Sequence, residues 1–343
     1  MASFTFNFLP TEETEQGITA QDQMPAEVPS NRPPSVRHSI GDLRSTLPET
    51  LEAQWVEKEA VGVWRREVGD VKFQAAQEVD PVEGQETSQS SLVLGSGPSD
   101  LVSGVYEGGL KTWECSEDLL AYLGNDELFP SGSLKGQSVL ELGCGSALPS
   151  LYLLRKHTDL EHVVLQDYNA HVLERITFPN CLLNTPSAPI QVSPSSQVLG
   201  ELETMDLNES VYDHLARRIS FVSGDWLDLT ETLHQGSSPS QAPALFHLIL
   251  TSETIYTTST YPALYQAMTR HLHPNGRILL AAKSVYFGCS GDLRSFLDYV
   301  DRVRGAELVW ERVYTSLDPQ GHHQQGVERE IIQLRWASLP KME

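Results

Sequence analysis

The sequence predicts an α/β fold with a mostly parallel sheet and helices on both faces. From residue 100 onward, short runs rich in Val, Leu and Ile alternate with helical patterns, which is typical of parallel strands joined by crossover helices. A glycine-rich turn also follows the first of these strands and opens a helix. The chain has 343 residues, 40% of them hydrophobic, which is enough to bury a sizeable core.

Each element of this fold follows from a local pattern. Short apolar runs that end at a polar residue or a glycine predict strands, and apolar residues at helical spacing predict helices. The strands are expected at 138–142, 162–166, 219–222, 245–250, 277–282, 307–314 and 328–335. The helices are expected at 116–122, 148–156, 171–177, 261–272 and 293–303.

Residues 1–99 differ in composition from the rest of the chain. Acidic residues outnumber basic ones there, and clusters of Pro and Ser recur. Such a stretch buries too little apolar surface to offset its conformational entropy, so we expect it to be largely disordered. A short helix is expected near 42–68, where leucines recur at helical spacing. Alternating Phe4, Phe6 and Phe8 are consistent with an edge strand, a docking peptide or a mobile tail.

Residues 100–343 are expected to form the globular domain. Two stretches rich in Ser, Pro and polar residues interrupt its alternating pattern, near 185–214 and near 235–243. We expect both to be surface inserts.

The charge of the chain limits its partners. It carries 24 Lys and Arg against 46 Asp and Glu, a formal net charge of −22. Such a chain repels phosphate groups and attracts basic peptides, so we expect no direct binding to nucleic acid or to an anionic membrane. We also expect no membrane span and no secretory signal, because no apolar run reaches about 18 residues and the first residues lack a basic start. The four cysteines are widely spaced, which favours reduced thiols over disulfides or a zinc site.

The glycine-rich turn predicts a nucleotide-type ligand. Gly143 and Gly145 allow a close approach to the backbone at the start of a helix. A dinucleotide fingerprint needs a third glycine, but Leu148 and Pro149 stand there, which weakens the case for a pyrophosphate. Glu141 precedes the glycines and suits a ligand with an amine or a cationic group. S-adenosylmethionine has an amine and a sulfonium, and it lacks a phosphate.

Further acids end the next two strands. Asp167 lies 22 residues after Gly145, a distance at which an acid can bind ribose hydroxyls. Asp225 follows the third strand and could accept a hydrogen bond from an adenine amino group, with Trp226 stacking or packing beside it. Taken singly, Glu141 or Asp225 also fits a turn or capping carboxylate. Together the strand-end features favour a cofactor site.

The fourth strand runs into residues that could carry chemistry. Glu253 and Tyr256 should lie at the mouth of the same pocket, because ligands of open α/β sheets bind beyond the carboxyl ends of the strands. A carboxylate there can orient an acceptor nitrogen or take up a proton. The alternative is a helix N-cap arrangement around Thr251 and Ser252. Upstream, the glycine-rich segment 104–114 could close over the ligand or form a plain turn before a helix.

In combination, several segments resemble the eukaryotic seven-β-strand protein-histidine N-methyltransferases of the methyltransferase-like superfamily. The most specific are YEGGLK-x-WEC within residues 100–122 and SETIY within residues 248–256. The other matching segments are VLELGCGSAL at 139–148, QDYN at 166–169, FPN at 178–180, GDW at 224–226 and KSVYFG at 283–288. The resemblance runs from Asp100 to Arg335 and implies a Rossmann-like, seven-stranded class I methyltransferase fold.

The resemblance also implies a cofactor, a substrate and a site. The family binds S-adenosylmethionine and methylates a histidine of a large-subunit ribosomal protein, so a basic ribosomal protein is the expected partner. We also expect a monomer located in the cytoplasm and nucleus. Cofactor contacts are implied at Thr112, Trp113, Glu114, Cys115, Gly143, Gln166, Asp167, Tyr168, Gly224, Asp225, Trp226 and Ser252. Ala147 and Pro149 stand where many relatives carry glycines, and Ala147 adds one methyl group near the ligand.

Histidine is an undemanding methyl acceptor. With a pKa near 6.5 it is roughly three-quarters neutral at pH 7, whereas a lysine near 10.4 needs on the order of 4–5 kcal/mol for deprotonation. We expect Glu253 to fix the tautomer of the acceptor and to accept the proton lost after transfer, and Tyr256 to shape the rim. Two alternatives stay open: a lysine methyltransferase on the same fold, and a non-catalytic ribosome-assembly factor that binds the cofactor.

Overall fold

The computed structural model describes residues 32–67, 69–71, 109–186, 188–193, 198–234, 244–303, 308–317 and 326–337. The chain divides into two units, Met1–Asn31 and Arg32–Glu343, and every described residue belongs to the second. Phe4, Phe6 and Phe8 therefore lie outside the described residues. Within the described ranges, no helix is both long and apolar enough to cross a membrane.

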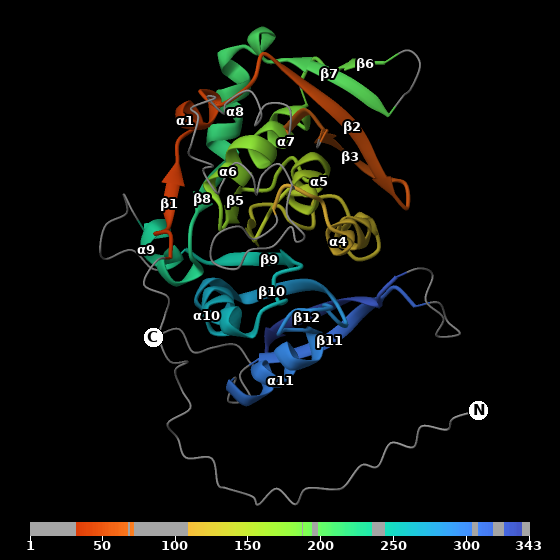
Figure 1. Ribbon diagram of the computed structural model, residues 1–343, viewed down its shortest axis with the longest axis vertical. Helices are drawn as coiled ribbons and strands as arrows, with labels where there is room; N and C mark the ends of the chain where they lie inside the picture. Colours follow the sequence, from red (N-terminus) through yellow and green to blue (C-terminus); the bar gives the residue numbers. More distant parts are fainter. Residues whose placement is uncertain are drawn as a thin grey trace, which may run out of the picture. The chain divides into compact units, whose positions relative to one another are not determined.

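The second unit is organised around an eight-stranded sheet with the order β1-β8-β5-β4-β9-β10-β12-β11 (Figure 1). Its strands are β1 (Val36–His38), β4 (Ser138–Leu142), β5 (His162–Asp167), β8 (Ile219–Ser223), β9 (Phe246–Ser252), β10 (Leu272–Lys283), β11 (Leu308–Thr315) and β12 (Arg329–Trp336). Neighbours from β8 to β10 pair in parallel, whereas β12 is antiparallel to β10 and β11, and β1 is antiparallel to β8. The predicted mostly parallel sheet is confirmed with all its strands, and β1 is an additional strand at its edge.

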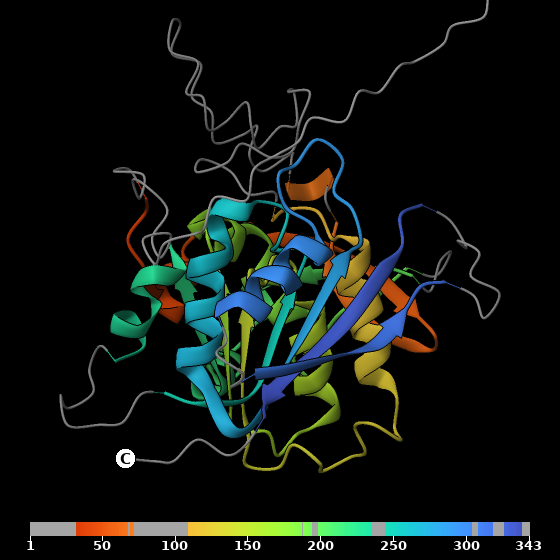
Figure 2. The ribbon, with the colours of Figure 1, turned by 90° about the horizontal axis from the view of Figure 1, so that it is seen from below.

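Helices cover both faces of this sheet, as predicted (Figure 1, Figure 2). One face packs against α4 (Glu114–Gly124), α5 (Leu148–Lys156), α7 (Phe178–Leu183) and α8 (Glu209–Arg218). The other packs against α9 (Leu229–His234), α10 (Tyr261–His271) and α11 (Leu293–Val303). Because side chains alternate along a strand, Val139 of β4 joins the first core, whereas Leu140 and Leu142 join the second.

Short helical segments complete the fold. They are α1 (Ile40–Arg44), α6 (Ala170–Val172), the π-helical η1 (Leu173–Thr177) and the 3-10 helices η2 (Thr204–Asp206), η3 (Trp226–Asp228) and η4 (Thr258–Thr260). α6 and η1 together fill the helix predicted at 171–177.

The helix predicted near 42–68 is wrong beyond its first residues. α1 ends at Arg44, and the chain then forms an antiparallel hairpin of β2 (Thr50–Lys58) and β3 (Val61–Arg66). Leu51 and Ala53 of β2 are buried, as are Val61 and Val63 of β3. This two-residue period is the pattern of a strand with one buried face.

The hairpin belongs to a second sheet with the order β3-β2-β7-β6. β6 (Gln191–Val192) and β7 (Leu199–Glu203) come from the insert predicted near 185–214, and β7 pairs with β2. That insert is therefore part of the folded unit, and Leu202 is fully buried. The predicted domain boundary at 100 is likewise too late, since the folded unit begins at Arg32. The insert predicted near 235–243 lies outside the described residues.

Candidate functional site

The glycine-rich turn joins β4 to α5 at the carboxyl end of the sheet. Gly143 and Gly145 have positive φ values of 63° and 48°, a conformation that side chains disfavour. A Cβ atom on Gly143 would lie 2.6 Å from Cγ2 of Thr254, so only glycine fits there. Ala147, at the N-cap of α5, also has a positive φ of 55° and is fully buried.

Gln166 at the end of β5 connects the ends of three strands. Its Oε1 accepts hydrogen bonds from the backbone N–H of Gly143 at 3.2 Å and from the indole of Trp226 at 2.6 Å. Its Nε2 donates to the carbonyl of Gly224 at 2.8 Å. The turn after β4 and the segment after β8 are therefore held together through one buried amide side chain.

Asp167, the last residue of β5, is buried beside the turn. Its Oδ2 accepts from the N–H of Gly145 at 2.9 Å, and its Oδ1 accepts from the N–H of Asn169 at 3.1 Å. Burial raises the pKa of Asp167 to about 6, although the backbone donors act in the opposite direction. Each carboxylate oxygen keeps acceptor capacity beyond these bonds.

Glu141 and Asp225 occupy capping positions, the role that the sequence left open for each of them. Glu141 is 1% exposed, and its Oε2 accepts from the N–H of Ser150 in α5 at 3.2 Å. Burial, together with the charge of Asp167, raises the pKa of Glu141 to about 7. Asp225 caps η3 by accepting from the N–H of Leu227 at 2.8 Å, and it forms an ion pair with Arg32.

The segment before α4 lies against the same turn. Thr112 is buried and donates from its hydroxyl to that of Ser146 at 3.0 Å. Trp113 forms the N-cap of α4, and Cys115 is fully buried in the first turn of that helix. Of the glycine-rich segment predicted at 104–114, residues 104–108 lie outside the described residues.

Asn180 of α7 forms hydrogen bonds with both the glycine-rich turn and the hairpin β2–β3. Its amide donates to the carbonyl of Ser146 at 2.9 Å and accepts from the backbone N–H of Arg66 at 2.7 Å. The residue is completely buried. The hairpin β2–β3 is thereby connected to the glycine-rich turn.

Glu253 stands at the end of β9 in a strained conformation. Its φ is 57°, and its backbone N–H donates to the carbonyl of Ala281 at 3.0 Å. The residue is 9% exposed, and among the described residues its Oε1 accepts no hydrogen bond. Strained backbone of this kind costs about 1–3 kcal/mol and clusters at functional sites.

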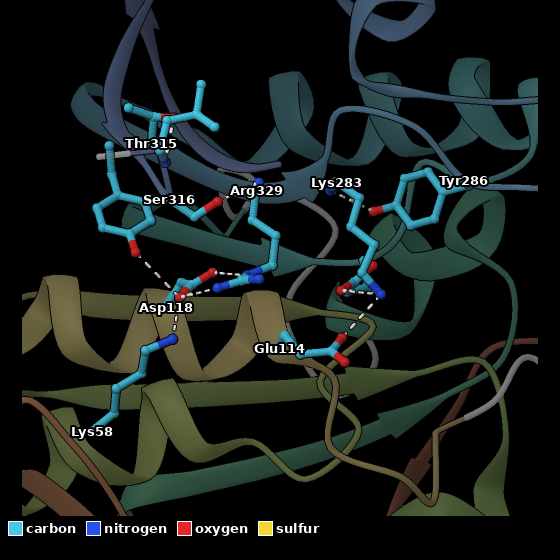
Figure 3. Close-up of polar contacts among 11 residues, drawn as sticks. Lys58, Glu114, Asp118, Lys283, Tyr286, Thr315, Ser316 and Arg329 are labelled. Atoms are coloured by element: carbon cyan, nitrogen blue, oxygen red, sulfur yellow. Dashed lines mark hydrogen bonds and ion pairs between the residues drawn. The ribbon is translucent and has the colours of Figure 1, made fainter. Parts of the chain in front are cut away.

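Lys283 at the end of β10 faces this carboxylate. Its Nζ lies 3.4 Å from Oε1 of Glu253 and 3.0 Å from Oε2 of Glu114, and it stands 5.1 Å from the ring centre of Trp113. Figure 3 shows Lys283 extending toward Glu114. Burial acts to lower the pKa of Lys283, but the two carboxylates outweigh it and raise that pKa.

Two further side chains flank Glu253. The pKa of the Cys115 thiol and the pKa of the Tyr286 hydroxyl are both raised, first by burial and then by the charge of Glu253. The hydroxyl oxygen of Tyr286 also accepts from the N–H of Lys283 at 3.2 Å. The ring of Tyr256 contacts that of Tyr286 edge to face, with centroids 6.4 Å apart.

The predicted site residues thus fall into two connected groups. The first surrounds the turn and contains Thr112, Glu141, Gly143, Gly145, Gln166, Asp167, Gly224, Asp225 and Trp226, with Tyr168 following Asp167 in the chain. The second surrounds Glu253 and contains Trp113, Glu114, Cys115 and Tyr256, with Ser252 preceding Glu253 in the chain.

Sequence reasoning missed Lys283 and Tyr286. Lys283 directly follows the predicted strand at 277–282, and Tyr286 lies in the segment just after it, so the strand-end rule that selected Asp167 and Glu253 applies here as well. It also missed a buried charge cluster one turn further along α4. Asp118 is 1% exposed and binds Lys58, and its Oδ2 lies 2.5 Å from Nε of Arg329 (Figure 3).

Comparison with known proteins finds relatives that share one name. No protein-family model matches the chain. Histidine protein methyltransferase 1 of Schizosaccharomyces pombe is 34% identical over 266 residues, which are 75% of this chain and 74% of that protein. The Saccharomyces cerevisiae protein of the same name is 31% identical over 293 residues, which are 78% of this chain and 75% of that protein.

The matches to other relatives are shorter. The histidine protein methyltransferase 1 homolog of Bos taurus is 37% identical over 206 residues, or 60% of this chain, and the chain spans only 52% of that protein. Among solved structures, a putative S-adenosylmethionine-dependent methyltransferase from Streptococcus mutans aligns with a TM-score of 0.44 and 10% identity, covering 84% of this chain and 56% of that one.

Proposed function

We propose that this chain, which belongs to the histidine protein methyltransferase 1 family, transfers a methyl group from S-adenosylmethionine to a histidine side chain of a protein. The observation that carries the proposal is the carboxylate of Glu253. It is buried at a strand end, and its Oε1 accepts no hydrogen bond among the described residues, although it forms an ion pair with Nζ of Lys283 at 3.4 Å. Such an oxygen is ready to accept the N–H of an imidazole.

The donor set around the glycine-rich turn fits S-adenosylmethionine. The carboxylates of Asp167, Asp225 and Glu253 lie at or just after the ends of β5, β8 and β9, which suits a cationic ligand and disfavours a pyrophosphate. Lys283 is engaged by Glu114 and Glu253. Asp167 is the residue to bind ribose hydroxyls, since its oxygens have lone pairs to spare. When bound, S-adenosylmethionine supplies an electrophilic methyl group on a sulfonium centre.

The residues around Glu253 then position the acceptor. Glu253 accepts the N–H of a neutral imidazole, which fixes the tautomer and leaves the lone pair of the other ring nitrogen free. That lone pair forms the new N–CH3 bond as the S–CH3 bond breaks. The product imidazolium carries one proton too many, and Glu253 takes it up. Lys283 keeps a positive charge beside Glu253, which favours its ionised form.

Histidine suits this arrangement better than lysine does. A neutral imidazole already has the lone pair that the reaction needs, whereas a lysine must first lose a proton at a cost of about 4–5 kcal/mol at pH 7. The positive charge of Lys283 beside Glu253 also disfavours a second ammonium group at the same carboxylate. Methylation of a lysine is the alternative outcome that the test distinguishes from methylation of a histidine.

We further propose a basic, large-subunit ribosomal protein as the substrate, acted on by a monomer in the cytoplasm and nucleus. The net charge of −22 supports a basic partner and argues against direct contact with nucleic acid.

Transfer of label tests the proposal. The purified chain is incubated with S-adenosylmethionine labelled in its methyl group and a lysate of cells that lack this protein. We expect a labelled protein band with the wild type and a loss of about 100-fold or more in rate with Glu253→Gln. Glu209→Gln is the control, since this glutamate is exposed on α8. Full activity in Glu253→Gln would refute the role of Glu253, and tight cofactor binding without any transfer would favour a non-catalytic assembly factor.

A further inference from the structure

The loop that follows β10 exposes two apolar side chains beside the site. Phe287 is 83% exposed and Val285 is 45% exposed. Between them, Tyr286 is partly buried and lies near Glu253. Figure 2 shows this loop rising beyond the carboxyl ends of the parallel strands. The two exposed apolar residues therefore flank, in the chain, a residue that contacts Glu253.

Phe287 is held there by a defined turn. The N–H of Cys289 donates to the carbonyl of Tyr286 at 3.2 Å, and Gly288 has a φ of 78°. A positive φ at the third residue of a hydrogen-bonded turn is the requirement of a type II turn. Phe287 is the second residue of this turn, so its backbone is fixed at the apex.

The loop is also tied to the segment after β9. The N–H of Gly291 donates to the carbonyl of Tyr256 at 2.9 Å, and the N–H of Thr258 donates to the hydroxyl of Ser290 at 3.2 Å. A Cβ atom on Gly291 would lie 2.4 Å from the carbonyl oxygen of Ile255. The two segments therefore pack backbone against backbone, which ties the loop to the segment that follows Glu253.

Two exposed apolar side chains beside the site offer a partner apolar surface to cover. Burial of a phenylalanine side chain is strongly favourable, so a molecule that covers Phe287 gains binding energy there. Here the exposed side chain is next in sequence to a residue of the site. The molecule that approaches this point during the proposed reaction is the segment that carries the acceptor histidine.

We propose that Phe287, together with Val285, forms a recognition site for the protein substrate and takes an apolar side chain close to the acceptor histidine. This inference rests on the proposed function. Tyr286 lies between the two exposed residues and reaches Glu253, so the recognised side chain and the acceptor lie a short stretch of chain apart. An extended peptide advances about 3.3 Å per residue, which places that side chain within a few residues of the histidine.

Kinetics with the labelled protein from the lysate test this inference. We compare the wild type with Phe287→Ser, with Phe287→Leu and with Met205→Ser. Met205 is the matched control, because it is 81% exposed and lies on η2 next to the second sheet. We expect Phe287→Ser to raise KM for the protein about tenfold and to leave kcat and the Kd for S-adenosylmethionine unchanged. Phe287→Leu should restore most of the loss.

Three results would overturn the inference. An unchanged KM in Phe287→Ser would show that the substrate does not use this residue. An equal rise in KM in Met205→Ser would show a nonspecific surface effect, and weaker cofactor binding would place Phe287 in the cofactor site. If the wild type labels a histidine and KM does not change, only this inference fails. If the wild type labels no protein, the proposed function fails with it.

Discussion

Replacing Lys283 by methionine removes the positive charge beside Glu253 and keeps the length of the side chain. The Nζ atom lies 3.4 Å from Oε1 of Glu253, and the side chains of this pair are 18% and 7% exposed. The same Nζ lies 3.0 Å from Oε2 of Glu114, whose side chain is 52% exposed. Lys283 therefore divides its charge between one buried and one half-exposed carboxylate.

The geometry sets the size of the effect. Two unit charges 3.4 Å apart interact with about 5 kcal/mol at an effective dielectric constant of about 20. Sharing with Glu114 and contact with water reduce this, so we use about 2 kcal/mol, which corresponds to about 1.5 pH units. The positive charge of Lys283 favours the ionised carboxylate of Glu253. Its removal should therefore move the acid limb of the pH–rate profile to higher pH by about 1.5 pH units.

The assay is the pH dependence of kcat for label transfer, measured at saturating cofactor and substrate. Lys283→Arg should keep the wild-type profile, because it keeps the charge. Glu114→Gln should not move the acid limb to higher pH, because the charge of Lys283 is then no longer shared with Glu114. If Lys283→Met kept the wild-type acid limb, the charge of Lys283 would not support Glu253, and the reasoning would be refuted.

Three further predictions concern the turn, the charge cluster and pH. Gly143→Ala should weaken cofactor binding about tenfold or more in calorimetry. The φ of Gly143 is 63°, and a Cβ atom there would lie 2.6 Å from Cγ2 of Thr254. Adding Thr254→Ser to this variant removes that carbon and should recover part of the lost affinity. Asp118→Asn should lower the free energy of unfolding by about 3 kcal/mol in urea, and an unchanged midpoint would contradict the role of this buried carboxylate. Burial raises the pKa of Asp167 from 3.8 to about 6. The free energy of unfolding of the ligand-free wild type should therefore fall, relative to that of Asp167→Asn, as the pH rises through this interval. A difference in free energy of unfolding between the two proteins that stays constant with pH would contradict this prediction.

Much of the main sheet could be predicted because its signals are local. Each parallel strand is buried on both faces and reads as a continuous apolar run. The helices between the strands carry the longer period, so α5 and α11 begin and end at the predicted residues. Together these two periods are enough to identify the fold class.

The hairpin β2–β3 could not be predicted from local signals. Its turn residues, Glu59 and Ala60, both have positive φ values, of 51° and 64°. Turns of this kind normally use Asn and Gly, so the sequence carries no turn signal there. Leu43 in α1, Leu47 in the connection and Leu51 in β2 stand four residues apart and imitate a helical period. The partner strand β7 lies far along the chain.

The site was predictable where it depends on the ends of strands. Gln166, Asp167 and Trp226 were expected near the turn, and hydrogen bonds connect all three to one another or to the turn glycines. The link from Glu253 to Glu114 depends on how α4 packs against β10, and no local pattern encodes that packing. The strand-end position of Lys283 can be read from the sequence, but its contacts with Glu114 and Glu253 appear only when three distant segments are placed together.

The acceptor residue is the most direct test of the account. The protein labelled by the wild-type chain is digested, and tandem mass spectrometry locates the methyl group on a single side chain. The account predicts one methylated histidine, absent when Glu253→Gln replaces the wild type. Methyllysine in its place would keep the fold and the cofactor site and would contradict the assignment of the acceptor.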